Sequence, residues 1–180
     1  SWVLGARRTQ REVEGPFTRQ GCMDVTILLG SKSDLPVAEK CTAVLKKLGI
    51  QYQLRVASAH RTPKFVESII EQAVEDDCQI FIAMAGLAAA LPGAVAALTT
   101  RPVIGVPCGG KVPYDSLLSI VQLPPGIPAA TVGVDRGDNA GYLAAQILAL
   151  KDPRVAAAIE EDRAEMKVRV HGMDEDVRGL

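Results

Sequence analysis

The sequence predicts an α/β fold, a three-layer sandwich in which helices cover both faces of a central parallel sheet. Three observations predict it. Short apolar segments alternate with helical patterns, each apolar segment has the length of a strand, and the helical patterns repeat at amphipathic spacing. The chain has 180 residues, of which 48% are hydrophobic and 23% charged. This length suits one domain with a substantial core.

Five short apolar segments are predicted as strands buried on both faces of the sheet. They are residues 25–29, 52–56, 80–85, 103–106 and 129–134. In a parallel sheet, ligands bind beyond the carboxyl ends of the strands. We therefore expect the chemistry in the loops that follow the strands. These loops are residues 30–34, 57–61, 85–93, 107–115 and 135–139.

Helices are predicted between the strands from the spacing of their apolar residues. Cys41, Val44, Leu45 and Leu48 follow i, i+3, i+4, i+7 spacing, and Val66, Ile69, Ile70 and Ala73 do the same. Gly49 stands where a helix C-cap glycine belongs. Thr62 is expected to cap the second helix, with Pro63 as its first residue.

A last helix is predicted to begin at Asp152-Pro153 and to end near Val170. We expect it to pack on a neighbouring subunit, with packing on its own domain as the alternative. The domain organisation is then a flexible extension over residues 1–22, one α/β catalytic domain over 23–170 that includes this helix, and a polar tail over 171–180.

Composition excludes several classes of function. The formal net charge of −1 gives no general attraction to nucleic acid or to an anionic membrane. No apolar run reaches the ~18 residues of a membrane span. The four cysteines form no CxxC pair, and no Cys/His cluster has zinc spacing. We expect a cytoplasmic protein with no metal and no cofactor.

The first loop, Gly30-Ser31-Lys32-Ser33-Asp34, lies between a predicted strand and a predicted helix. Backbone N–H groups and the hydroxyls of Ser31 and Ser33 at a helix N-terminus suit an anion, most often phosphate. Asp34 is expected to cap the helix or to accept hydrogen bonds from ribose hydroxyls. A capped turn without a ligand is the alternative.

The second and third loops add an acid/base candidate and an apolar wall. Ser58, His60 and Arg61 follow the second strand, and a histidine beside an arginine suits proton transfer next to a bound anion. The third loop, which contains Gly86 and Leu87, is small and uncharged. Its backbone can approach a flat ring closely and supply N–H groups to a carboxylate. A tightly packed helix start is the alternative.

Six motifs together resemble the aminoimidazole ribonucleotide carboxylase catalytic-subunit family, in its N5-carboxyaminoimidazole ribonucleotide mutase branch. The resemblance covers about residues 24–170. The motifs are GSKSD (30–34), SAHRTP (58–63), AGLAAALPG (85–93), PVIGVP (102–107), DSLLSIVQLPPGIP (115–128) and NAGYLAAQIL (139–148).

The resemblance implies a flavodoxin-like fold and a homo-octamer with active sites at subunit junctions. It implies a mutase or isomerase of purine (IMP) biosynthesis that moves a carboxylate from the exocyclic amine to carbon 4 of the imidazole. The resemblance also implies that the reaction needs no ATP, metal or biotin and that an ATP-dependent synthetase precedes it in the pathway. His60 would transfer the proton at carbon 4. The expected substrate-binding residues are Ser31, Ser33, Asp34, Ser58, Arg61, Gly86 and Leu87.

One position departs from the mutase pattern, because Ala90 stands where that branch usually has histidine. A direct carboxylase, which uses free aminoimidazole ribonucleotide and carbon dioxide, is one alternative. Arg61 and Leu87-Ala88 differ from the pattern of that branch. A catalytically silent nucleotide-binding homologue is the other alternative, and the presence of His60 speaks against it.

Overall fold

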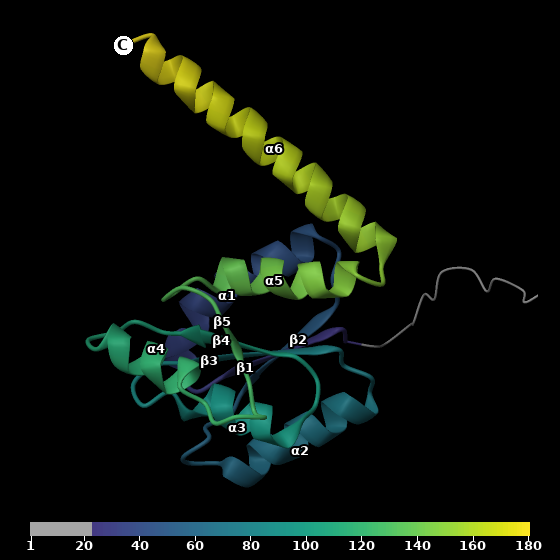
Figure 1. The fold of residues 1–180 in the computed structure, drawn as a ribbon, viewed down its shortest axis with the longest axis vertical. Helices are drawn as coiled ribbons and strands as arrows, with labels where there is room; N and C mark the ends of the chain where they lie inside the picture. Colours follow the sequence, from purple (N-terminus) through teal and green to yellow (C-terminus); the bar gives the residue numbers. More distant parts are fainter. Residues whose placement is uncertain (1–22) are drawn as a thin grey trace, which may run out of the picture.

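The computed structural model describes residues 23–180, which form a five-stranded sheet with helices on both faces (Figure 1). The strands are β1 (Val25–Leu29), β2 (Tyr52–Val56), β3 (Ile80–Ala85), β4 (Val103–Pro107) and β5 (Ala130–Thr131). Their order is β2-β1-β3-β4-β5, and all pairings are parallel. This is the flavodoxin-like order, so the predicted fold class is confirmed. The extension predicted for residues 1–22 lies outside the described residues.

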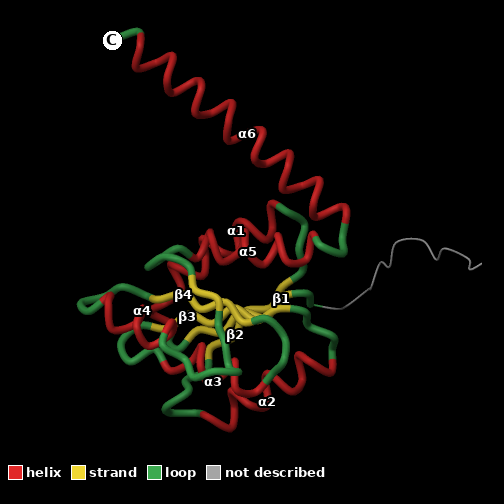
Figure 2. The backbone as a smooth tube through the Cα atoms, viewed as in Figure 1, coloured by secondary structure: helices red, strands yellow, loops and turns green. Residues whose placement is uncertain are grey.

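Helices connect the strands and form the two outer layers (Figure 2). They are η1 (Lys32–Asp34), α1 (Leu35–Lys47), α2 (Pro63–Glu75), α3 (Ala90–Leu98), α4 (Pro113–Val121), α5 (Gly137–Ala149) and α6 (Pro153–Arg178). Helices α1 and α5 cover one face of the sheet, and α2 and α3 cover the other. No helix among residues 23–180 has the length and apolar character needed to cross a membrane.

Strands β1, β3 and β4 are largely apolar and buried throughout, because helices cover both faces of the sheet there. The edge strand β2 contains Gln53 and Arg55 and is half-buried or exposed. In β1, Val25, Ile27 and Leu29 pack in the core beneath α1 and α5, whereas Leu28 packs on the side of α2 and α3. All five residues of β1 are buried. This central position places the loop after β1 in the middle of the carboxyl edge of the sheet.

Two glycines let α5 approach α1 closely. A Cβ atom on Gly137 would lie 2.0 Å from the carbonyl oxygen of Val37, and one on Gly141 would lie 3.1 Å from that of Cys41. No larger residue fits at Gly137 without moving the backbone. The close contact holds the start of α5, and with it the loop after β5, against the helix that follows the first loop.

The structure differs from the sequence prediction at both late elements. β5 has two residues instead of the six predicted over 129–134, because the chain turns there and the Asp135 N–H bonds the carbonyl of Pro107 at 2.9 Å. α6 continues eight residues past Val170, through the segment predicted as a polar tail. That segment contains no proline, and an i,i+4 pair between Arg178 and Asp174 supports its last turn.

Helix α6 contacts the domain only near its beginning and then projects away from it (Figure 1). Asp152 caps its N-terminus by accepting the Arg154 N–H at 2.9 Å, as expected. One turn after the buried Ile159, the buried carboxylate of Asp162 accepts hydrogen bonds from Lys47 of α1 and from the Tyr142 hydroxyl of α5, the latter at 2.6 Å. Beyond Asp162 the side chains are exposed or half-buried.

Candidate active site

The first loop forms a capping box at the start of η1. The Ser31 side chain accepts the Ser33 N–H at 3.3 Å, and the Ser31 N–H donates to Asp34 Oδ2 at 3.1 Å. Ser31 is half-buried, Ser33 is exposed and Asp34 is buried. Asp34 therefore belongs to the capping box of η1, whereas at the N-cap position of α1 its side chain makes no capping hydrogen bond. The loop lies at the carboxyl edge of the sheet.

Asp34 and Cys108 form a buried polar pair beside this loop. Burial raises the pKa of the Asp34 carboxyl above its ordinary value and the Asp135 carboxylate adds to the rise, while the Ser31 N–H and the Cys108 thiol oppose it. Burial and the carboxylates of Asp34 and Asp135 raise the pKa of Cys108 to about 12. The thiol therefore stays protonated near neutral pH, and Cys108 is a poor nucleophile.

The second loop is a turn closed by its own hydroxyls. The Ser58 Oγ accepts the Arg61 N–H at 3.2 Å, and the Thr62 Oγ1 accepts the Ser58 N–H at 3.0 Å. Thr62 stands at the N-cap position of α2, as predicted, but its hydroxyl bonds Ser58 and makes no capping hydrogen bond. Pro63 does begin the helix, as predicted. The turn leaves the side chains of His60 and Arg61 exposed.

Arg61 links the second loop to the first. Its Nη2 donates to the carbonyl oxygen of Gly30 at 3.3 Å. The guanidinium therefore lies next to Ser31. A cation beside the hydroxyls of Ser31 and Ser33 at a helix start is a suitable place for a phosphate.

The third loop is shorter than predicted, because α3 already begins at Ala90 and includes Pro92 and Gly93 in its first turn. Proline is tolerated there because the first N–H groups of a helix have no partner within the helix. Gly86 is half-buried, and a Cβ on it would lie 3.7 Å from the Cys108 carbonyl oxygen. The Leu87 side chain is 75% exposed.

These loops meet at the point where the connections change from one face of the sheet to the other. β1 leads into α1 on one face, and its neighbour β3 leads into α3 on the opposite face. The Gly30 N–H bonds the carbonyl of Met84 in β3 at 3.0 Å, which joins the starts of both loops. A crevice at this switch point is the usual ligand site of such sheets.

Two acidic residues of the site were inside the predicted loops but were not chosen as site residues. Asp135 has φ +57° and accepts the Gly109 N–H at 2.9 Å, so it joins the loops after β4 and β5. Asp115 accepts the Ala88 N–H at 2.5 Å and so reaches the third loop. A sequence signal for Asp135 was available, because aspartate tolerates the left-handed backbone conformation and this one stands in a loop that follows a strand. No sequence signal pairs Asp115 with Ala88.

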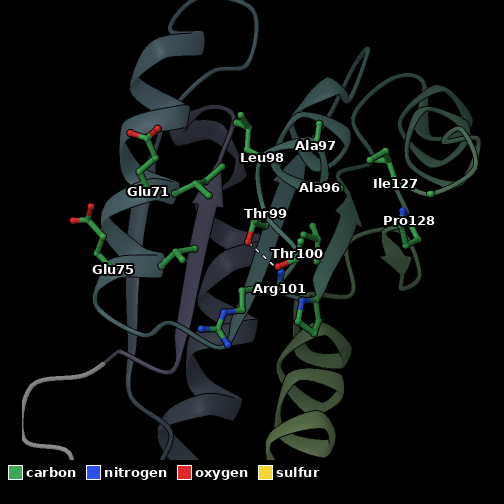
Figure 3. Close-up of a pocket in the computed structure, with 15 residues that line it drawn as sticks. Glu71, Glu75, Ala96, Ala97, Leu98, Thr99, Thr100, Arg101, Ile127 and Pro128 are labelled. Atoms are coloured by element: carbon green, nitrogen blue, oxygen red, sulfur yellow. Dashed lines mark hydrogen bonds between the residues drawn. The ribbon is translucent and has the colours of Figure 1, made fainter.

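A surface cavity lies at the opposite edge of the sheet, between α2, α3 and residues 126–128 (Figure 3). Glu71 and Glu75 border it on α2, and Arg101 lies at the amino end of β4, where its N–H bonds the Thr99 hydroxyl at 3.1 Å. None of the predicted site residues lines this cavity. Within residues 23–180, no group of three or more histidine, cysteine, aspartate or glutamate side chains is arranged to hold a metal ion.

The chain is similar to known proteins over almost all of its described length. It is 54% identical over 157 residues to an N5-carboxyaminoimidazole ribonucleotide mutase of Methanocaldococcus jannaschii, which covers 87% of this chain and 98% of that protein. It is 47% identical over 153 residues to a mutase of the same name from Pyrococcus abyssi, covering 84% and 88% of the two chains.

Solved structures agree with this similarity. A crystal structure of Treponema denticola PurE superposes with a TM-score of 0.74 at 32% identity, covering 87% of this chain and 97% of that one. The sequence model of AIR carboxylase matches residues 24–169, which span every strand and most of α6. The chain is therefore a member of the AIR carboxylase family.

Proposed function

We propose that this protein is a mutase of purine biosynthesis that converts N5-carboxyaminoimidazole ribonucleotide into 4-carboxy-5-aminoimidazole ribonucleotide. The observation that supports this most is the 54% identity to a mutase of that name along nearly its whole length. The carboxyl edge of the sheet is consistent with such a substrate, because it presents the Arg61 cation and the hydroxyls of Ser31 and Ser33 beside an uncharged loop. The same arrangement suits a phosphate joined to a flat ring.

The substrate would lie across the crevice with its phosphate at the first loop. Ser31, Ser33 and Arg61 would hold the phosphate, since Arg61 already reaches Gly30. Asp34 would accept the ribose hydroxyls with the lone pairs that the Ser31 N–H leaves free. Ser58 would support the turn that presents His60, and the backbone of Gly86 and Leu87 would face the ring.

The reaction would proceed by release and recapture of carbon dioxide. The bond between the exocyclic nitrogen and the carboxyl carbon breaks as that nitrogen takes up a proton. Carbon 4 then attacks the freed carbon dioxide, and His60 removes the proton that remains on carbon 4. The small, uncharged third loop would keep the carbon dioxide beside the ring and keep water away. Atoms balance, because the product is an isomer of the substrate.

We also propose that the chain works as a homo-oligomer, with the homo-octamer as the assembly that the family resemblance implies. Helix α6 exposes Val170, Met173 and Val177, which are spaced by three or four residues and so form one apolar stripe. Helix α4 exposes Tyr114, Leu118 and Val121 in the same way. A second copy of the chain is the partner that would cover both surfaces.

Separate incubations with two substrates test the proposed function. The protein is supplied either with the carbamate substrate or with aminoimidazole ribonucleotide plus bicarbonate, and the 4-carboxy product is measured. Conversion of the carbamate alone is the expected result. Preferential use of the free ribonucleotide would identify a direct carboxylase.

Ala90 provides the test of the silent alternative. It is half-buried at the first position of α3, and its N–H bonds the Ala88 carbonyl at 2.6 Å. A wild-type protein without turnover whose Ala90→His variant is active would be a silent homologue. An active wild-type protein whose pH–rate profile the same substitution leaves unchanged would show that position 90 is catalytically neutral.

A further inference from the structure

The third loop donates a hydrogen bond to a residue far away in the sequence. The Ala88 N–H donates to Asp115 Oδ2 at 2.5 Å across a separation of 27 residues. A short bond from an N–H to an ionised carboxylate is stronger than one between neutral groups. It joins the loop after β3 to the first turn of α4, two segments that belong to different strand–helix units.

The loop needs such support because its backbone is irregular at consecutive residues. Ala88 has φ +50°, in the left-handed region that is unfavourable for a residue with a Cβ. Ala89 follows with φ −59° and ψ +66°, an inverse γ-turn closed by the bond from the Ala90 N–H to the Ala88 carbonyl at 2.6 Å. Ala89 is 1% exposed and packs in the core, so the turn can shift little on that side.

Asp115 is itself held in place. It is the third residue of α4, its N–H bonds the Val112 carbonyl at 3.2 Å, and its own carbonyl accepts the Ser119 hydroxyl at 2.8 Å. The next residue, Ser116, is fully buried and donates to the Cys108 carbonyl at 3.0 Å. The first turn of α4 therefore bonds both the end of β4 and the third loop.

These contacts fix the two ends of the loop by different means. At its start, the Cys108 N–H bonds the Ala85 carbonyl at 2.9 Å, so β4 holds the loop where it leaves β3. At its end, the charge-assisted bond from Ala88 to Asp115 sets the direction of the chain before α3. The backbone of Gly86 and Leu87 lies between these two points. Its position relative to the first loop therefore depends on both.

We infer that Asp115 is a positioning residue for the proposed carboxyl transfer. It holds Ala88 in the left-handed conformation, so that the backbone of Gly86 and Leu87 forms the wall against which carbon dioxide and the ring are held. This inference depends on the proposed function. Asp115 does not itself touch the substrate. Its removal therefore affects turnover more than substrate binding, because the phosphate and ribose contacts lie on the first two loops.

The test compares three variants with the wild-type protein. Asp115→Ala is expected to lower kcat by about 10- to 100-fold while KM changes by less than about threefold, the scale expected when reacting groups shift by up to an ångström. Asp115→Asn keeps an acceptor oxygen and should retain most of the turnover. The double variant Asp115→Ala/Ala88→Gly should recover part of the lost kcat, because glycine adopts the left-handed conformation without the bond.

Hydrogen exchange of the Ala88 amide gives a second measurement that needs no activity. Exchange should become faster in Asp115→Ala and stay slow in Asp115→Asn. Asp152→Ala is the matched control. Asp152 is also a carboxylate that accepts a backbone N–H, that of Arg154 at 2.9 Å, but it lies far from the third loop. It should leave both kcat and Ala88 exchange unchanged.

The outcomes separate this inference from the proposed function. An inactive wild-type protein overturns the function, and the exchange data then decide by themselves whether Asp115 holds the loop. An active wild-type protein with unchanged kcat in Asp115→Ala overturns the positioning role. The positioning role would also be overturned if Asp115→Asn lost as much kcat as Asp115→Ala and the added Ala88→Gly substitution recovered none of the loss. The hydrogen bond would then not be the cause of the lost turnover.

Discussion

The side chains of the crevice differ in exposure, and this difference separates their roles. His60 and Arg61 are exposed on the second loop, where a substrate can reach them. Asp34 and Cys108 are buried beneath it and are tied to each other. An exposed histidine can exchange its proton with substrate and solvent, whereas a buried thiol with a pKa of about 12 keeps its proton. This difference supports the proposal that His60 transfers the proton.

Replacement of His60 tests this assignment. His60→Asn should reduce kcat by about 100-fold or more, the usual contribution of a positioned acid/base, and should leave KM nearly unchanged. The measurement is steady-state kinetics with the carbamate substrate. His171→Asn is the matched control, because His171 is exposed on α6, away from the crevice. Near wild-type turnover in His60→Asn would rule out the proposed proton transfer.

Arg61 is expected to contribute to binding instead. Arg61→Ala should raise KM by about tenfold or more with a small effect on kcat, because a contact to a distant phosphate stabilises ground state and transition state alike. Arg154→Ala, which removes an exposed arginine near the opposite edge of the sheet, serves as the control. A fall in kcat without a change in KM would contradict a phosphate-binding role.

At the scale of the elements, one buried carboxylate attaches α6 to the domain. Asp162 is 2% exposed and accepts hydrogen bonds from Lys47 of α1 and Tyr142 of α5. These two bonds lower the pKa of Asp162 below its ordinary value. The Asp162 carboxylate also raises the pKa of Tyr142 to about 12, together with the burial of its ring. Helices α1, α5 and α6 therefore meet at the Asp162 carboxylate.

The lowered pKa predicts how this attachment depends on pH. A carboxyl whose pKa is lower in the folded state stabilises that state above its unfolded pKa, and the contribution disappears as pH falls through the folded pKa. Asp162→Asn should therefore be less stable than the wild-type protein at pH 7, and the difference should shrink below about pH 4. Urea unfolding at several pH values measures this difference.

An exposed acid on the same helix provides the comparison. Asp174 pairs with Arg178 at 3.6 Å on the exposed part of α6. Asp174→Asn should change the free energy of unfolding by no more than about 0.5 kcal/mol at any of these pH values, as exposed ion pairs contribute little. A constant difference between Asp162→Asn and the wild-type protein down to pH 3 would show that the charge of Asp162 has no part in the attachment.

At the scale of the whole molecule, α6 and α4 present apolar surface that the single chain does not cover. The stripe of Val170, Met173 and Val177 lies on the part of α6 that projects from the domain (Figure 1). The exposed face of α4 lies next to the third loop, because Asp115 bonds Ala88. A partner that covers α4 would therefore also enclose the crevice, which links assembly to activity.

Light scattering tests the proposed assembly. An octamer would have eight times the chain mass of 19.1 kDa, which is about 153 kDa. The variant Met173→Glu/Val177→Glu should give smaller species, because charges on the stripe oppose its burial. Glu161→Lys/Glu175→Lys, at exposed positions on the opposite face of α6, is the control. A wild-type mass near 19.1 kDa would contradict the proposal.

The sequence by itself determined the bounds of strands β1, β2 and β3 to the residue. For β1 and β3, the reason is that largely apolar segments between turn residues have no other stable place than a covered sheet. It also determined the loops that hold the site, since the switch point follows from strand–helix alternation and parallel strands. The sequence did not predict where α6 ends. Residues 171–178 have no apolar pattern directed at the domain, and local pairs support the helix there.

Only the tertiary structure decided which loop residues meet. It directed the Thr62 hydroxyl to Ser58 instead of the start of α2, and it placed Asp34 against Cys108 and Asp115 against Ala88. Each of the last two pairs joins residues from different strand–helix units. Periodicity and turn chemistry report a residue's immediate neighbours in the chain, whereas these partners are set by the order of the strands and by how closely the helices pack on them.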